Sequence, residues 1–245
     1  QIAAGFQIAM IAIHHHTLFP QRGYQKLNNV QFIKQILMEP PIIIDPPMNT
    51  RSGSFQQIME NPLHKITINP DDFLCFPAQV GHFIIYIYFN KEFIGLGSAL
   101  ANLFELVQEQ ELMKAPDAIC VFGAKRSELK DYGDFPTVYF DDIENNLLVG
   151  VVPDGDEFGY FGYLKKMALT LHNVLCIKKG RLPVHGAMVN IKLKGNITAN
   201  VLLVGDSGAG KSESIEAFRS LSATYLRQMT VIFDDMGSLV IEDGD

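Results

Sequence analysis

Short runs of apolar and β-branched residues recur through the middle of the chain, separated by polar and turn-forming residues. A run of four to eight such residues bounded by turn signals is typical of a strand. The pattern therefore predicts strands at residues 65–68, 83–89, 118–123, 137–143 and 147–153.

Apolar residues with helical spacing occur in two longer segments. Residues 98–112 form one amphipathic pattern, and residues 160–180 form a second that closes with a glycine after two lysines, a common helix C-terminus. Residues 1–60 mix apolar, helix-like pieces with proline-rich breaks, and we expect connecting and packing material there. Strands and helices mixed in this way indicate an α/β fold.

The last quarter of the chain predicts a strand, a glycine-rich loop and a helix in that order. A hairpin signal at residues 194–196 leads into an apolar run at 199–205, which we interpret as a buried strand. Residues 212–226 then predict a helix with one apolar face, formed by Ile215, Phe218, Leu221 and Tyr225.

These patterns predict two domains. We expect a mixed N-terminal α/β domain over residues 1–181 and the start of a nucleotide-binding domain over residues 182–245. The chain begins with Gln1 and stops ten residues after Asp235, where a nucleotide-binding sheet usually needs more strands. We therefore expect the second domain to be incomplete.

Composition narrows the class of protein. A hydrophobic content of 47% supports a globular core, and a net charge of −7 argues against a nucleic-acid partner. No apolar run reaches the length of a membrane-spanning helix, so no membrane partner is expected. Cys75, Cys120 and Cys176 are odd in number and far apart, which favours reduced thiols and a cytoplasmic location. The oligomeric state is left open.

The loop GDSGAGKS carries the strongest chemical signal, because it matches the phosphate-binding pattern G-x-x-x-x-G-K-[ST]. Glycines let successive backbone N–H groups turn inward, and the helix start adds a partial positive charge. Lys211 is expected to reach the terminal phosphates of ATP, and Ser212 to contact Mg²⁺. The predicted nucleotide site comprises Gly205, Asp206, Ser207, Gly208, Ala209, Gly210, Lys211 and Ser212.

A pair of acids follows the next predicted strand. Residues 230–233 are apolar, and Asp234 with Asp235 stands at their C-terminal end. Two adjacent carboxylates in this place can serve one metal directly and a second metal or a water.

Residues 160–236 resemble the ATP-dependent phosphoenolpyruvate carboxykinases. The similarity rests on YFGYLKK, a histidine in LPVHGAMVNI nineteen positions after Lys166, the glycine loop, and the aspartate pair. It implies a P-loop nucleotide-binding domain of the carboxykinase type, which converts oxaloacetate and ATP into phosphoenolpyruvate, ADP and CO₂.

The resemblance also implies roles for individual residues. Lys166, His185 and Asp235 would bind a transition metal, typically Mn²⁺, between the substrate and the γ-phosphate. Tyr160 would lie against the carboxylate substrate, and Arg51 in NTRSGS would hold a substrate carboxylate by a bidentate fork. The implied catalytic group is completed by Lys165, Lys211 and Asp234, the latter two with Ser212 handling ATP and Mg²⁺.

Two alternatives stay open. Glu213 follows Ser212 where the carboxykinases usually have two threonines after the lysine, and the loop is also similar to that of the bacterial HPr kinase/phosphorylases. In such a serine kinase Asp234 and Asp235 would handle metal and protons, and His185 would lie close to the phosphates as a general base or an orienting residue. A non-catalytic nucleotide-binding regulator is the other alternative. The YFGYLKK segment favours the carboxykinase.

The triplet His14, His15 and His16 invites a metal-site interpretation. Adjacent side chains point in different directions, so three in a row rarely converge on one ion. We therefore expect no metal site there.

Overall fold

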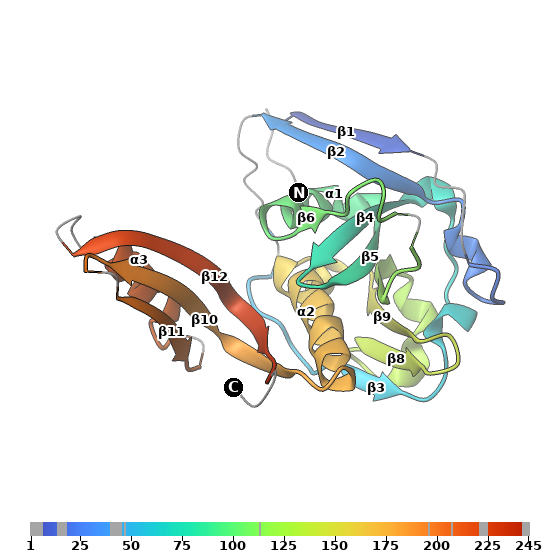
Figure 1. Ribbon diagram of the computed structural model, residues 1–245. Helices are drawn as coiled ribbons and strands as arrows, with labels where there is room; N and C mark the ends of the chain where they lie inside the picture. Colours follow the sequence, from blue (N-terminus) through green and yellow to red (C-terminus); the bar gives the residue numbers. More distant parts are fainter. Residues whose placement is uncertain are drawn as a thin grey trace. The chain divides into compact units, whose positions relative to one another are not determined.

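The computed structural model describes residues 7–13, 19–39, 46, 48–112, 114–195, 197–206, 208–220 and 225–241 (Figure 1). The chain divides into two compact units, Gln1–Leu175 and Cys176–Asp245. The division lies a few residues before the expected boundary at 181/182. The histidine triplet lies outside the described residues.

The first unit is built on a mixed sheet (Figure 1). Its strand order is β1-β2-β4-β5-β7-β9-β8-β3, and a short strand, β6, pairs with β4. The strands are β1 (Gln7–Ile13), β2 (Gln31–Glu39), β3 (Gln56–Ile58), β4 (Phe73–Val80), β5 (Phe83–Asn90), β6 (Glu105–Leu106), β7 (Ala118–Ala124), β8 (Val138–Asp142) and β9 (Leu147–Pro153). This architecture confirms the mixed α/β class.

Three parallel strands, β5, β7 and β9, form the centre of this sheet. Every residue of β7 and β9 is buried, because parallel strands are usually covered on both faces. Helix α2 (Phe161–Lys178) covers one face (Figure 1). A Cβ added to Gly150 of β9 would lie 2.6 Å from the sulfur of Met167 in this helix. The strands predicted at 83–89, 118–123, 137–143 and 147–153 are confirmed, as is the helix within 160–180.

The other face packs on the N-terminal segments. Leu27 and Leu63 are fully buried in one cluster with Tyr86 and Val149 of the central strands. The Phe32 and Tyr86 rings meet edge to face, with centroids 4.9 Å apart.

Short 3₁₀ turns connect the elements at Gln25–Leu27, Pro62–His64, Pro70–Asp72, Lys91–Phe93, Leu100–Asn102, Arg126–Glu128, Lys130–Tyr132 and Asp156–Phe158.

Residues 1–60 differ from the expectation of helix-like connecting material. Where they are described, they contribute β1, β2 and β3, and β1 pairs with β2 along its full length. The predicted strand at 65–68 is also wrong, since this segment is held by side chains: Lys26 donates to the Ile66 carbonyl at 2.5 Å, and Glu128 accepts from the Thr67 amide.

The helix predicted at 98–112 is wrong as well. Helix α1 (Ile94–Ala99) ends where that prediction begins, and the chain then forms a 3₁₀ turn and β6. Strand β2 pairs with β4 at two registered positions, and β6 pairs with β4 further along, at Ala78 and Gln79. Satisfying the backbone of β4 therefore outweighs the amphipathic pattern of the segment.

The second unit is an antiparallel sheet in the order β11-β10-β12, with one helix on it (Figure 1). Its elements are β10 (Leu182–Leu193), β11 (Thr198–Val204), α3 (Lys211–Ser220) and β12 (Leu226–Leu239). Ala187, Val189 and Ile191 of β10 are buried with Ile215 of α3.

Two details of this unit correct the sequence interpretation. Helix α3 ends at Ser220, Leu221 lies outside the described residues, and Tyr225 stands in a turn with 67% of its surface exposed. Strand β11 is present but not buried, because it is an edge strand and α3 packs against β10 and β12; Val204 is 67% exposed.

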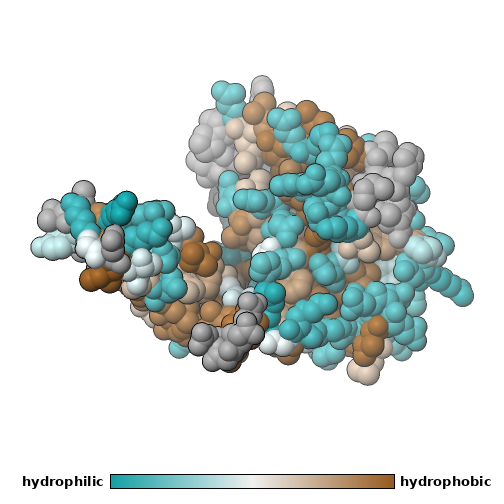
Figure 2. Space-filling model, in the orientation of Figure 1, coloured by the Kyte–Doolittle hydropathy of each residue, from teal (hydrophilic) through white to brown (hydrophobic). Residues whose placement is uncertain are grey.

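Within the described part of the chain, no helix combines the length and apolar character needed to cross a membrane. Figure 2 shows hydrophilic residues spread over much of the visible surface, with apolar areas between them.

The cysteines Cys75, Cys120 and Cys176 are buried and form no disulfide, and burial raises the pKa of Cys120 to about 12.

A buried hydrogen bond joins the N-terminal segment to the end of β8. Tyr24 donates to the Asp142 carboxylate at 2.6 Å, and Asn145 donates to the same group from its amide and side chain. Burial by itself would raise the pKa of Asp142, but the hydrogen bonds from Tyr24 and Asn145 hold that pKa below its ordinary value. The bond therefore stabilises the fold when Asp142 is ionised, at pH values above the pKa of an unfolded aspartate.

We expect Tyr24→Phe to lower the free energy of unfolding by about 1–3 kcal/mol at neutral pH, because a buried carboxylate loses a donor. The difference from the wild type should shrink as the pH falls through the native pKa of Asp142, where the carboxylate becomes protonated. Urea unfolding followed across this pH range measures it. Tyr139→Phe is the matched control, since that hydroxyl makes an exposed contact of 3.4 Å with Gln57. If the loss of unfolding free energy in Tyr24→Phe did not change with pH, the hydrogen bond to ionised Asp142 would not be its cause.

Candidate functional site

The glycine loop lies between β11 and α3, in the order predicted. Gly208 and Gly210 have φ values of +81° and +80°, a region that residues with a Cβ rarely adopt. Helix α3 begins at Lys211, so its unpaired first N–H groups and positive dipole end lie at the loop. Ser207 lies outside the described residues. The local geometry is that of an anion-binding turn.

Lys211 is folded over this loop. Its Nζ donates to the carbonyl oxygens of Gly205 and Asp206, at 2.8 Å each. The ammonium group is therefore held at the loop that would receive phosphates.

Ser212 contacts the first acid of the pair. Its hydroxyl donates to Asp234 at 3.0 Å, and both side chains are exposed. Asp234 reaches the helix start because β12 pairs with β10 and sets Asp234 opposite Ala187, in the strand that packs beneath α3. A hydroxyl and a carboxylate oxygen at this position are ligands that Mg²⁺ accepts.

His185 contacts the second acid. The Nε2 atom of His185 lies 3.4 Å from Oδ1 of Asp235, and the side chains are 38% and 28% exposed. Asp235 is set opposite Gly186 in the β10–β12 register, directly beside His185. An imidazole nitrogen and a carboxylate oxygen are a suitable start for a transition-metal site.

The aspartate pair does not end its strand, as the sequence had suggested, since β12 continues to Leu239. Instead, Asp235 has a φ of +80°, which residues other than glycine rarely adopt. Backbone strain of this kind is concentrated at functional sites. The two acids thus reach two different partners beside one loop.

An apolar hollow of about 450 Å³ adjoins the loop. Aliphatic side chains of Val184, Leu202 and Val204 line it, together with His185 and Asp206. The sequence interpretation missed Leu202 and Val204 because it treated residues 199–205 as a buried strand. The alternation of a sheet covered on one face would have indicated one exposed side.

The remaining candidates belong to the first unit. Lys165 and Lys166 are half-buried in α2, and Tyr160 precedes this helix. The Tyr160 ring packs over Gly162, where an added Cβ would lie 2.2 Å from a ring carbon. This contact explains the glycine of YFGYLKK.

Arg51 is exposed in the loop before β3, with its guanidinium carbon 4.6 Å from the centroid of the Phe55 ring. The neighbouring Ser52 is hydrogen-bonded to Tyr163 of α2 through both its amide and its carbonyl. Tyr163 was missed by the sequence interpretation, although it lies three residues after Tyr160 in the motif.

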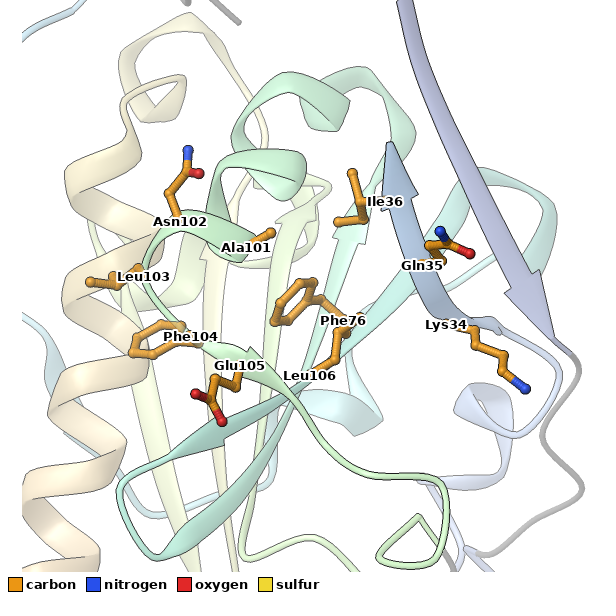
Figure 3. A pocket seen from close by; sticks show the side chains of 10 residues that line it. All are labelled: Lys34, Gln35, Ile36, Phe76, Ala101, Asn102, Leu103, Phe104, Glu105 and Leu106. Carbon is orange, nitrogen blue, oxygen red and sulfur yellow. The ribbon is translucent and has the colours of Figure 1, made fainter. Parts of the chain in front are cut away.

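Two further hollows in the first unit contain none of the predicted site residues. One, of about 480 Å³, lies between β2 and residues 101–106, with Phe76 near its centre and Lys34 pointing away from it (Figure 3). Another, of about 770 Å³, is lined by Tyr24 and Asp142.

Among the described residues, no three His, Cys, Asp or Glu side chains gather closely enough to hold a metal ion. The implied manganese set has two residues of these types, His185 and Asp235, and takes a lysine as its third member. The second unit brings these two together, and Lys166 belongs to the first unit.

No protein-family model matches the chain, and no curated protein matches its sequence. Function is therefore inferred from the residues and their geometry. The central observation is the pair of contacts, Ser212 with Asp234 and His185 with Asp235.

We expect Gly186→Ala to disturb this site. An added Cβ would lie 2.6 Å from the backbone oxygen of Leu203, so β10 and β11 must separate just before the loop. The affinity for ATP, which the loop sequence predicts, should fall about tenfold or more, and overpacking should destabilise the unit by about 1–3 kcal/mol. Calorimetric ATP titration and thermal unfolding measure both effects. Thr198→Ala, at an exposed position of β11, is the control; wild-type ATP affinity in Gly186→Ala would contradict this account.

Proposed function

We propose that this protein catalyses phosphotransfer of the ATP-dependent phosphoenolpyruvate carboxykinase type, converting oxaloacetate and ATP into phosphoenolpyruvate, ADP and CO₂. One observation carries the proposal: two adjacent carboxylates beside a phosphate loop reach two different partners, Ser212 and His185. A reaction that joins two anionic reactants needs positive charge at two neighbouring points.

The nucleotide half of the proposal rests on the loop. Backbone N–H groups of the loop and the start of α3 would bind the phosphates of ATP, and Lys211 would exchange its carbonyl partners for phosphate oxygens. Ser212 and Asp234 would hold Mg²⁺ on the nucleotide, which their 3.0 Å contact supports.

The second half rests on His185 and Asp235. Together with Lys166, these residues would hold Mn²⁺, as the resemblance to the carboxykinases implies. A dication there would stabilise negative charge on the substrate oxygen beside the γ-phosphate. Oδ1 of Asp235 lies 3.4 Å from Nε2 of His185, close enough for the two atoms to bind one ion.

Arg51 and Tyr160 would bind the organic acid. Loss of CO₂ from oxaloacetate leaves an enolate, and its oxygen attacks the γ-phosphorus of ATP while ADP departs. The guanidinium of Arg51 would hold a carboxylate through two parallel hydrogen bonds. Lys165 and Lys211 would offset the charge of the approaching anions.

A serine kinase acting on a protein or small molecule is the second candidate. The contact between His185 and Asp235 favours it, because a carboxylate that orients an imidazole is a common general-base arrangement. This reaction would use the same loop and acids but would not require Lys166. A regulator that binds ATP without turnover would use the loop alone.

We expect Lys166→Met to abolish manganese-dependent release of CO₂ and ADP from oxaloacetate and ATP, with a loss of about 10³-fold or more, while ATP still binds. A coupled assay of ADP formation, run beside calorimetric ATP titration, separates the two. Lys179→Met is the matched control, because Lys179 is exposed beyond the end of α2.

Each alternative has its own outcome in this assay. Transfer of label from γ-labelled ATP to a hydroxyl acceptor, unaffected by Lys166→Met, would identify the serine kinase. ATP binding without any turnover in the wild type would identify the regulator.

A further inference from the structure

We infer that Tyr163 is a positioning residue: its hydroxyl fixes the Arg51 loop, residues 49–55, against α2 and so sets where the guanidinium meets a carboxylate substrate. The identity of that substrate rests on the proposed function. We call the hydrogen bonds between the Tyr163 hydroxyl and the backbone of Ser52 the latch, and both residues belong to the first unit.

The hydroxyl of Tyr163 acts as both donor and acceptor toward one residue. It accepts from the Ser52 amide at 2.8 Å and donates to the Ser52 carbonyl at 3.2 Å. Tyr163 is 1% exposed and Ser52 is exposed, so the tyrosine hydroxyl reaches these backbone groups from the buried side of the loop. A single buried side chain thereby binds both backbone groups of the residue next to Arg51.

The loop is anchored again after Ser52. Thr137 donates from its hydroxyl to the Ser54 carbonyl at 3.1 Å, and the Gln56 amide donates to the Thr137 carbonyl at 3.0 Å. Gly53 has a φ of +71° and packs against Phe135, where an added Cβ would lie at 3.2 Å. The backbone from Ser52 to Gln56 is thus held on α2 and on the segment that leads into β8.

Arg51 stands at the end of this anchored backbone. Its guanidinium carbon lies over the Phe55 ring, 4.6 Å from the centroid, in a cation–π contact. A guanidinium can make such a contact and still offer its N–H groups to a carboxylate. Tyr160 and Lys166 lie three residues before and after Tyr163 in the sequence, Tyr160 just ahead of α2 and Lys166 within it. Tyr163 therefore joins the Arg51 loop to the segment that carries the other substrate and metal candidates of the first unit.

The variant Tyr163→Phe removes the hydroxyl of the latch but keeps the aromatic ring, so it tests the hydrogen bonds separately from the packing of the ring. The Tyr163 ring meets Phe158 with centroids 5.2 Å apart, and phenylalanine can keep this contact. The variant should bind oxalate, a small dicarboxylate probe, about tenfold more weakly in the presence of Mn²⁺, and should raise the KM for oxaloacetate about tenfold with kcat changed less than about twofold. Its affinity for ATP should not change.

Hydrogen exchange at the Ser52 amide gives a readout that does not depend on activity, and it should become at least about tenfold faster in Tyr163→Phe.

Arg51→Lys should weaken oxalate binding, and adding Tyr163→Phe to it should weaken binding little further, because both changes remove one carboxylate contact. Thr137→Val removes the second anchor and should act in the same direction if Tyr163→Phe fails to fold. Tyr139→Phe, on β8, is the control and should match the wild type.

The outcomes separate the latch from the reaction. Faster Ser52 exchange with unchanged oxalate affinity would show a purely structural tyrosine and overturn the inference, as would a wild type that binds no oxalate. Oxalate binding that depends on Tyr163 and Arg51, in a protein that releases no CO₂, would sustain the inference and overturn the proposed reaction.

Discussion

The antiparallel pairing of β12 with β10 is the constraint on which the candidate site depends. This register sets Asp234 opposite Ala187 and Asp235 opposite Gly186. One carboxylate then reaches Ser212 at the start of α3, and the other reaches His185. A shift of the register by one residue would exchange the faces of the strand and separate both contacts. The placement of both carboxylates therefore depends on the pairing of the sheet.

In the first unit, the candidate polar residues are supported by a buried sheet and the helix packed on it. Its parallel strands β7 and β9 are buried throughout, and α2 packs on this layer through contacts such as that of Met167 with Gly150. A helix held in this way presents Lys165 and Lys166 from a fixed surface, with Tyr160 just before its first residue. The Arg51 loop has no regular structure of its own and takes its position from Tyr163 and Thr137.

Local patterns predicted the elements whose stability is largely local or fully buried. The runs at 83–89, 118–123 and 147–153 are strands because continuous apolar runs suit the buried centre of a parallel sheet. The patterns failed where a distant partner decided the conformation. Strand β1 forms against β2, and residues 105–106 join β4 although their spacing suits a helix.

By itself, the sequence determined the glycine loop between β11 and α3, because the glycines, Lys211 and Ser212 are neighbours in the chain and their geometry is set by local backbone freedom. It also determined which residue types were available for metal and carboxylate binding. Only the tertiary structure decided which of them meet: Asp235 contacts His185 through pairing of separate strands, and Tyr163 binds Ser52 across 111 positions of the chain. Such contacts depend on register and packing of the whole unit, and no local pattern of residues encodes them.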